Sequence, residues 1–155
     1  MAYKVDAYVE PHYPLKKSLL IRAAESALSS ANVKGKVELA ISVIGDRKMR
    51  QLNKQYREID APTDVLAFSY TLDTGKPREF VTPPSKYLNL GDVTISYPQL
   101  IVRAAREETM VDEMASLLVA HGVLHLLGYN HEKPQEAAAM ESLEDKALSL
   151  ANVQN

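Results

Sequence analysis

Residues 111–128 read VDEMASLLVAHGVLHLLG, a strongly apolar stretch that closes with Gly128. A run of this length, rich in leucine and alanine, predicts an α-helix that is buried on most sides. Glycine is the residue that most readily takes the left-handed conformation beyond a helix end. We therefore expect a central helix from Val111 to Leu127.

Strand and helix patterns alternate on both sides of this helix. The expected strands, recognised by period-2 alternation, are Tyr3–Val9, Val37–Ile44, Asp64–Tyr70 and Gly91–Ser96. The other expected helices are Leu15–Ala31, Arg47 to about Tyr56 with Asp46 as the N-cap, Pro98 to about Glu107, and Pro134 to about Leu150. Residues 71–90 contain Gly75, Pro77, Pro83 and Pro84 and are expected to form a long irregular loop or a ragged hairpin. This order predicts an α+β fold, with residues 1–155 as a single domain of one mixed four-stranded sheet packed by about five helices.

The composition excludes several classes of protein. The chain has 155 residues, of which 46% are hydrophobic and 25% charged, as is usual for a soluble globular protein. Cysteine is absent, which excludes disulfide scaffolds, thiolate zinc sites and thiol nucleophiles. No apolar run reaches the ~20 residues of a membrane helix and the start lacks a signal peptide, so we expect a cytoplasmic protein without membrane contact. The net charge of -2 means that a nucleic acid would bind only at a local basic patch.

Three of the four histidines lie close together at the end of the central helix. His121 and His125 are four residues apart, so their imidazoles project from one helix face about one turn apart. Gly128 lets the chain turn back, which can bring His131 to the same point. Three imidazoles with one open position are typical of a catalytic zinc site. The alternative is three unrelated histidines on a buried helix, although buried imidazoles without partners would be costly.

The histidine spacing also matches the motif H-E-x-x-H-x-x-G-x-x-H of a class of zinc metalloproteases. In that motif the glutamate after the first histidine is the general base. Here the equivalent position is Gly122. The residues therefore predict the metal site of those enzymes without their peptide-cleaving base.

A basic stripe lies on the helix expected after Asp46. Arg47, Arg50, Lys54 and Arg57 recur at spacings of 3, 4 and 3. Such a run is most often a solvated helix face. The alternative is a phosphate-binding surface, in which Arg57, at the helix end, holds two phosphate oxygens through its guanidinium.

Three segments resemble signatures of the YbeY family. They are NKQYREIDAPTDVLAF at residues 53–68, LGDVTIS at residues 90–96 and HGVLHLLGYNH at residues 121–131. The resemblance extends from about Val37 to Met140. Asn130 stands where the family usually has aspartate, and Ala67 where it has serine. Because a carboxylate beside a ligating histidine commonly raises its basicity, Asn130 is expected to change the metal affinity or preference without removing a ligand.

The YbeY family comprises bacterial and organellar metal-dependent endoribonucleases that act in ribosomal RNA maturation and ribosome quality control. The resemblance implies that His121, His125 and His131 hold one Zn²⁺ or another divalent ion. It also implies that Arg57 belongs to the active cleft and that His121 is essential for cleavage. The implied partners are RNA, namely rRNA, the small ribosomal subunit, a small-subunit ribosomal protein and a ribosome-assembly GTPase.

The expected reaction is cleavage of an RNA phosphodiester by a metal-activated water, which either attacks phosphorus as hydroxide or deprotonates a nearby 2′-OH that attacks instead. Arg57 would offset the charge that develops on the phosphate, and Arg50 and Lys54 would follow the RNA backbone. Two other functions fit the same residues: a zinc hydrolase of peptides or small amides, and a non-catalytic ribosome-assembly factor whose metal is structural. The sequence sets no oligomeric state.

Overall fold

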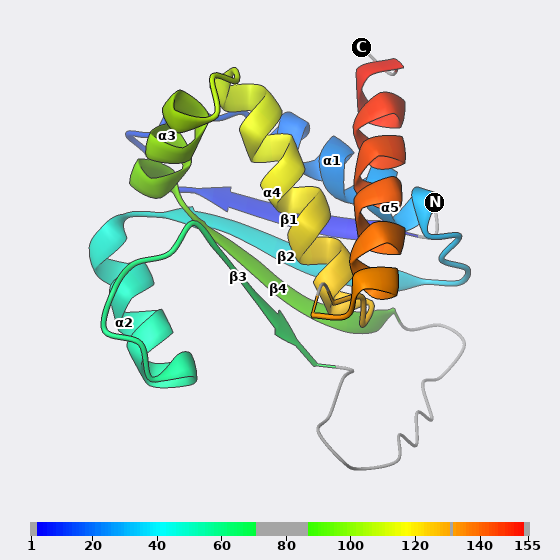
Figure 1. Cartoon of the computed structure of the whole chain (residues 1–155), viewed down its shortest axis with the longest axis horizontal. Coiled ribbons are helices and arrows are strands. Elements are labelled where there is room, and N and C mark those ends of the chain that lie inside the picture. The colour runs from blue at the N-terminus through cyan, green and yellow to red at the C-terminus, as the bar shows by residue number, and fades with distance from the viewer. Residues whose placement is uncertain (1–2, 71–86, 131, 154–155) are drawn as a thin grey trace.

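The computed structural model describes residues 3–70, 87–130 and 132–153, which contain one four-stranded sheet in the order β1-β2-β4-β3. Strands β1 (Tyr3–Val9), β2 (Val37–Ile44) and β4 (Leu88–Ser96) are parallel, and β3 (Val65–Ser69) pairs antiparallel with β4 at one edge. The helices of the described residues are α1 (Lys17–Ser30), α2 (Asp46–Arg57), α3 (Tyr97–Arg106), α4 (Val111–Leu126) and α5 (Pro134–Val153). The predicted α+β fold, with one mixed four-stranded sheet and five helices, is confirmed (Figure 1).

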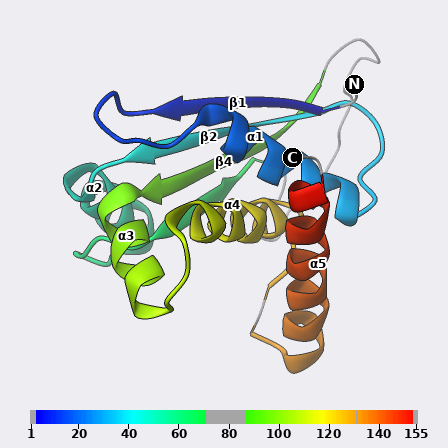
Figure 2. The same ribbon diagram turned by 90° about the horizontal axis from the view of Figure 1, so that it is seen from above.

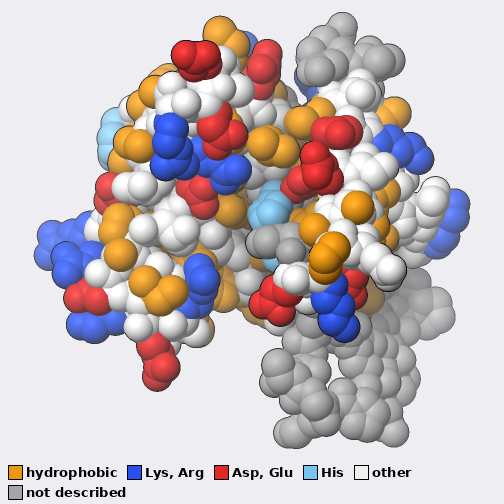
Figure 3. Space-filling view, viewed as in Figure 1, with side chains coloured by type: hydrophobic (Ala, Val, Ile, Leu, Met, Phe, Trp, Pro, Cys, Tyr) orange, Lys and Arg blue, Asp and Glu red, His pale blue; other side chains and the backbone are white. Residues whose placement is uncertain are grey.

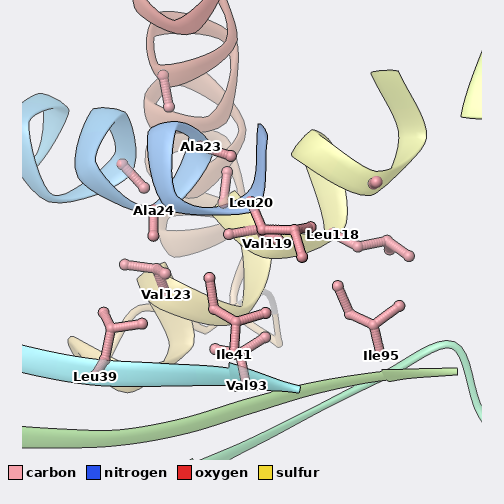
Figure 4. Packing of buried hydrophobic residues seen from close by; sticks show 14 of the residues in the cluster. Leu20, Ala23, Ala24, Leu39, Ile41, Val93, Ile95, Leu118, Val119 and Val123 are labelled. Atoms are coloured by element: carbon pink, nitrogen blue, oxygen red, sulfur yellow. The ribbon is translucent and has the colours of Figure 1, made fainter. Parts of the chain in front are cut away.

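The main core lies between the sheet and the helices α1, α3 and α4 (Figures 1 and 2). Helix α5 packs against α1 and α4 and adds Ala147 to this core. Figure 4 shows Leu20 and Ala24 of α1, Ile41 of β2, Val93 of β4 and Val123 of α4 converging in this layer. All five are less than 2% exposed. Helices usually cover the apolar faces of parallel strands. Of the helices that do so here, α4 is the most apolar, as its sequence predicts.

A smaller core forms on the other face of the sheet, where α2 packs. Met49 of α2 is buried with Ile44 and Leu66, and Phe68 packs against them. Successive strand residues point to opposite faces, so Leu66 and Phe68 contact α2 while Val65 and Ala67 face the main core. The short edge strand β3 is therefore held from both sides.

The end of α2 is fixed by its own backbone and by one buried amide. Glu58 adopts the left-handed conformation at φ 59°, and the Ile59 N–H donates to the Asn53 carbonyl. Asn53 is 2% exposed, and its Nδ2 donates to the Ala61 carbonyl at 2.8 Å. These contacts hold Arg57, the last residue of α2, beside the segment that enters β3.

Two local predictions are wrong. Gly45, not Asp46, is the N-cap of α2, because the Asp46 carboxylate instead accepts hydrogen bonds from Ser96 Oγ at 2.7 Å and from Gln99 Nε2. Residues 88–90, expected in the loop, belong to β4, because pairing with β2 extends the strand past a register shift at Glu38/Leu39. Residues 71–86 of the predicted loop lie outside the described residues.

No helix in the described parts of the chain has the length and apolar character that crossing a membrane requires.

Candidate functional site

A cleft of about 560 Å³ opens beside β3, between α3 and α4. Its lining combines Arg57 of α2, residues 63–67 and Ser69 of the β3 segment, Arg103 of α3, His121, Gly122 and His125 of α4, and Asn130 and Glu132 after α4. Figure 3 shows histidine surface in a hollow near the centre of this face, with acidic side chains at its border. Segments far apart in sequence thus meet around one solvent-accessible space.

The two helical histidines point their ring nitrogens at one another. His121 Nε2 and His125 Nε2 are 3.1 Å apart, and the rings meet edge to face. Two nitrogens bound tetrahedrally to one zinc at 2.0–2.1 Å would be about 3.3 Å apart. The pair therefore fits two adjacent positions of a zinc coordination sphere, and imidazole nitrogen is a donor that zinc prefers.

The chain turns back toward the cleft directly after these histidines. Gly128 ends the helical region at φ 100°, its N–H donates to the His125 carbonyl, and the Tyr129 N–H donates to the Leu124 carbonyl. Asn130 and Glu132 both line the cleft. The expected third ligand, His131, lies outside the described residues, and among the described ones no group of three or more possible ligands forms.

A glutamate from the last helix contacts the histidine pair. Glu144 Oε2 lies 2.7 Å from His121 Nδ1, and the Glu144 side chain is 14% exposed. Glu144 is not among the site residues predicted from the sequence. A signal was present in the sequence, since Glu144 interrupts the apolar stripe of α5 formed by Met140, Ala147 and Ala151.

Two arginines from different helices line the cleft. Arg57 was predicted there, and Arg103 was not. Arg103 Nη1 donates to Asp64 Oδ2 at 2.7 Å and its Nε donates to Glu107 Oε2 at 2.6 Å. Burial by itself would lower the pKa of Arg103, but the hydrogen bonds to Glu107 and Asp64 raise it overall. Arg103 is thus a fixed cation whose charge is already balanced.

Two arginines of the basic stripe on α2 make different contacts. Arg50 donates to both carboxylate oxygens of Asp60, at 2.7 and 3.1 Å. This hydrogen-bonded pair lowers the pKa of Asp60 from its ordinary value. Lys and Arg side chains gather at the end of the molecule where α2 lies (Figure 3). Of the four stripe residues, Arg57 is the one that reaches the cleft.

Gly122 is a packing requirement of α4. A Cβ at this position would lie 2.6 Å from Val93 Cγ1 and 3.0 Å from its Cγ2, and Val93 is fully buried in β4. The position that carries the glutamate base in the similar protease motif therefore faces the sheet. A glutamate there would overlap Val93, which argues against peptide hydrolysis by that mechanism.

We expect Gly122→Ala to lower the free energy of unfolding by roughly 1–2 kcal/mol, because overpacking outweighs the gain in helix propensity. Urea denaturation of the metal-free protein measures this change. In a double-mutant cycle with Val93→Ala, the two losses should be less than additive, since the smaller residue removes the overlapping methyls. Additive losses would show that the Val93 contact is not the cause.

Comparison with known proteins identifies the family. The model of the family "Endoribonuclease YbeY" matches residues 11–152. Endoribonuclease YbeY of Chloroflexus aggregans is 36% identical over 150 residues, which cover 96% of either chain. Endoribonuclease YbeY of Roseiflexus castenholzii is 39% identical over 147 residues, covering 93% of this chain and 90% of the relative. The solution structure of TM1509 from Thermotoga maritima has the same fold, with a TM-score of 0.61 at 21% identity, covering 95% of this chain and 88% of that one. On the extent of these matches, the chain belongs to the YbeY endoribonuclease family.

Proposed function

We propose that this protein is a metal-dependent endoribonuclease that cleaves single-stranded segments of ribosomal RNA during ribosome maturation and quality control. Membership of the family supports RNA cleavage as the class of reaction. The observation that carries the proposal is the single cleft that brings Arg57, His121 and His125 together. Metal-assisted cleavage of a phosphodiester uses a divalent cation and a cationic group for the phosphate oxygens, and the two histidines and Arg57 are the residues we assign to these roles.

The residues that would hold the metal are His121, His125 and His131. The 3.1 Å separation of the first two Nε2 atoms and the open cleft beside them support the assignment. The third remains a prediction from the sequence. Zinc is the ion that best suits three imidazoles. When bound, a divalent ion at this position supplies Lewis-acid charge and lowers the pKa of a coordinated water.

Arg57 is the residue we assign to the scissile phosphate. Its backbone is fixed at the end of α2, and no carboxylate of the described residues forms an ion pair with it. Arg103, by contrast, is already bound to Asp64 and Glu107. The planar guanidinium of Arg57 can bind two non-bridging oxygens at once and offset the charge that builds up on them during hydrolysis.

We assign the exposed basic side chains of α2, including Lys54, to the RNA backbone leading to the cleft. Arg50 contributes less to this path than the sequence predicts, because Asp60 already binds it. With a net charge of -2, the protein depends on this local surface for RNA affinity. We propose rRNA of the small ribosomal subunit as the substrate in the cytoplasm. The implied ribosomal protein and assembly GTPase would place the enzyme on it.

The test is cleavage of a small-subunit rRNA fragment by the purified protein beside His121→Ala, prepared identically. We expect a chelator to abolish cleavage by the original protein and one divalent metal to restore it, with no restoration in the variant. Metal-independent cleavage, or equal cleavage by both preparations, would contradict the proposal and would point to a contaminating nuclease. Casein hydrolysis by the same samples would instead support the peptide-hydrolase alternative.

A further inference from the structure

The C-terminal helix α5 brings a carboxylate to the face of His121 that points away from His125. Glu144 Oε2 is 2.7 Å from His121 Nδ1, and the two residues are 23 positions apart in the chain. The other ring nitrogen of His121 is the one that lies 3.1 Å from His125 Nε2. His121 therefore lies between Glu144 on one side and the expected metal position on the other.

The place of Glu144 on α5 is an unusual one for a charged residue. Positions 140, 144, 147 and 151 form one stripe of the helix at spacings of four, three and four. The other three members, Met140, Ala147 and Ala151, are at most 8% exposed, and α5 packs against α1 and α4. A carboxylate in such a stripe loses much of its hydration, which is costly unless a partner compensates for it. In the described residues that partner is His121.

The hydrogen bond determines which nitrogen of His121 is available to a metal. An ionised carboxylate can only accept hydrogen bonds, so Nδ1 carries the proton and donates it to Glu144. In the neutral imidazole, which is the form that binds a metal, Nε2 then carries the lone pair, and this nitrogen lies beside His125. The same contact fixes the rotation of the imidazole ring, which otherwise has to be ordered when the ion binds.

We infer that Glu144 is the positioning residue of the metal site, acting through Nδ1 of His121, and that α5 is for this reason part of the active site. The inference rests on the proposed metal-binding function of His121. A carboxylate or carbonyl that accepts the second N–H of a ligating histidine typically accounts for 10–100-fold in metal affinity, through orientation and ligand basicity. Glu144 is a positioning residue and not a ligand, since its contact is with the nitrogen opposite the metal.

The test measures Zn²⁺ and Co²⁺ affinity by competition with a chelator for three variants. Glu144→Met keeps the length of the side chain but removes the acceptor, and we expect affinity to fall about 10–100-fold. Glu144→Gln retains an oxygen acceptor for Nδ1, so its loss should be clearly smaller. The control is Glu141→Gln, which removes a carboxylate from an exposed position one turn earlier on α5 and should leave affinity unchanged.

The melting temperature of the metal-free proteins shows how much of the effect is structural. Glu144→Met removes one partner of the His121–Glu144 contact and leaves the other in place, so the metal-free variant should melt lower than the original protein. Co²⁺ absorption should also change in this variant, because the ligand field depends on the orientation of His121. A lower melting temperature with unchanged affinity and Co²⁺ spectrum would overturn the inference.

The same measurements distinguish failure of this inference from failure of the proposed function. If the original protein binds Zn²⁺ and cleaves RNA while Glu144→Met binds Zn²⁺ equally well, only the role of Glu144 is wrong. If the original protein binds Zn²⁺ more tightly than Glu144→Met but does not cleave RNA, the positioning role holds and the proposed function is wrong. If the original protein binds no metal, both are wrong, and this is apparent before any variant is made.

Discussion

His125→Ala is expected to abolish metal binding and RNA cleavage together. The variant removes one of the two nitrogens that lie 3.1 Å apart and leaves His121 and the predicted ligand His131, two imidazoles in place of three. Loss of a hydrogen-bond partner of a ligating histidine already lowers metal affinity by about 10–100-fold. Loss of a direct ligand should therefore lower metal affinity by more than about 100-fold. Metal analysis of the dialysed protein should find about one ion per chain in the original protein and almost none in the variant, with cleavage reduced to background.

The matched control is His12→Ala. His12 is the histidine outside the cluster, and its ring packs on Tyr13 with the centroids 4.3 Å apart. This control should retain full metal content and cleavage. Circular dichroism of both variants shows whether the fold is intact. A folded His125→Ala protein with a full complement of metal would contradict the ligand assignment, whatever its activity.

Arg57→Ala is expected to reduce cleavage by about 10²–10³-fold while the metal content stays unchanged, the size of effect seen when one preorganised donor to a developing oxyanion is removed. The metal content should stay unchanged because Arg57 lines the cleft from α2, whereas the two helical histidines belong to α4. Single-turnover cleavage with saturating enzyme measures the chemical step separately from RNA binding. Arg57→Lys should recover part of the loss, since it restores the charge but not the two parallel N–H donors.

The control for Arg57 is Arg106→Ala, which removes an exposed arginine of α3 that does not line the cleft. Both variants lower the net charge equally, so a general electrostatic effect on RNA affinity would reduce cleavage in both. We expect a loss in Arg57→Ala alone. Full single-turnover activity in Arg57→Ala would contradict its role at the phosphate, and a simultaneous loss of metal would indicate that it supports the metal site instead.

Most of the secondary structure could be predicted from the sequence, because the spacing of apolar residues that defines a helix or a strand involves only residues close together in the chain. Strands β1 and β2 have the bounds that their alternation predicts, and α4 begins where the apolar run begins. The two wrong predictions, the N-cap of α2 and the start of β4, occur where contacts with residues distant in the sequence determine the local structure. Asp46 is used by Ser96 and Gln99 and so does not cap its own helix, and pairing with β2 extends β4 to Leu88.

The family, the α+β class and the candidate residues Arg57, His121, His125 and His131 could all be predicted without a structure, because motif spacing and helical periodicity depend only on neighbouring residues. The family and the fold class are confirmed, and the metal ligands and the role of Arg57 stay predictions. The joint lining of one cleft by Arg57 and the two helical histidines is a finding of the structure.

The other residues of the site are known from the tertiary structure. In the folded chain, Glu144 of α5 contacts His121, Arg103 lines the cleft and position 122 faces Val93. In the sequence, the place of Glu144 in an apolar stripe does not identify its partner, and Arg103 forms an ordinary i, i+4 pair with Glu107. Their partners lie 23 and 39 residues away, at His121 and Asp64. Such contacts depend on how helices and strands pack in space, and the spacing of neighbouring residues does not encode that arrangement.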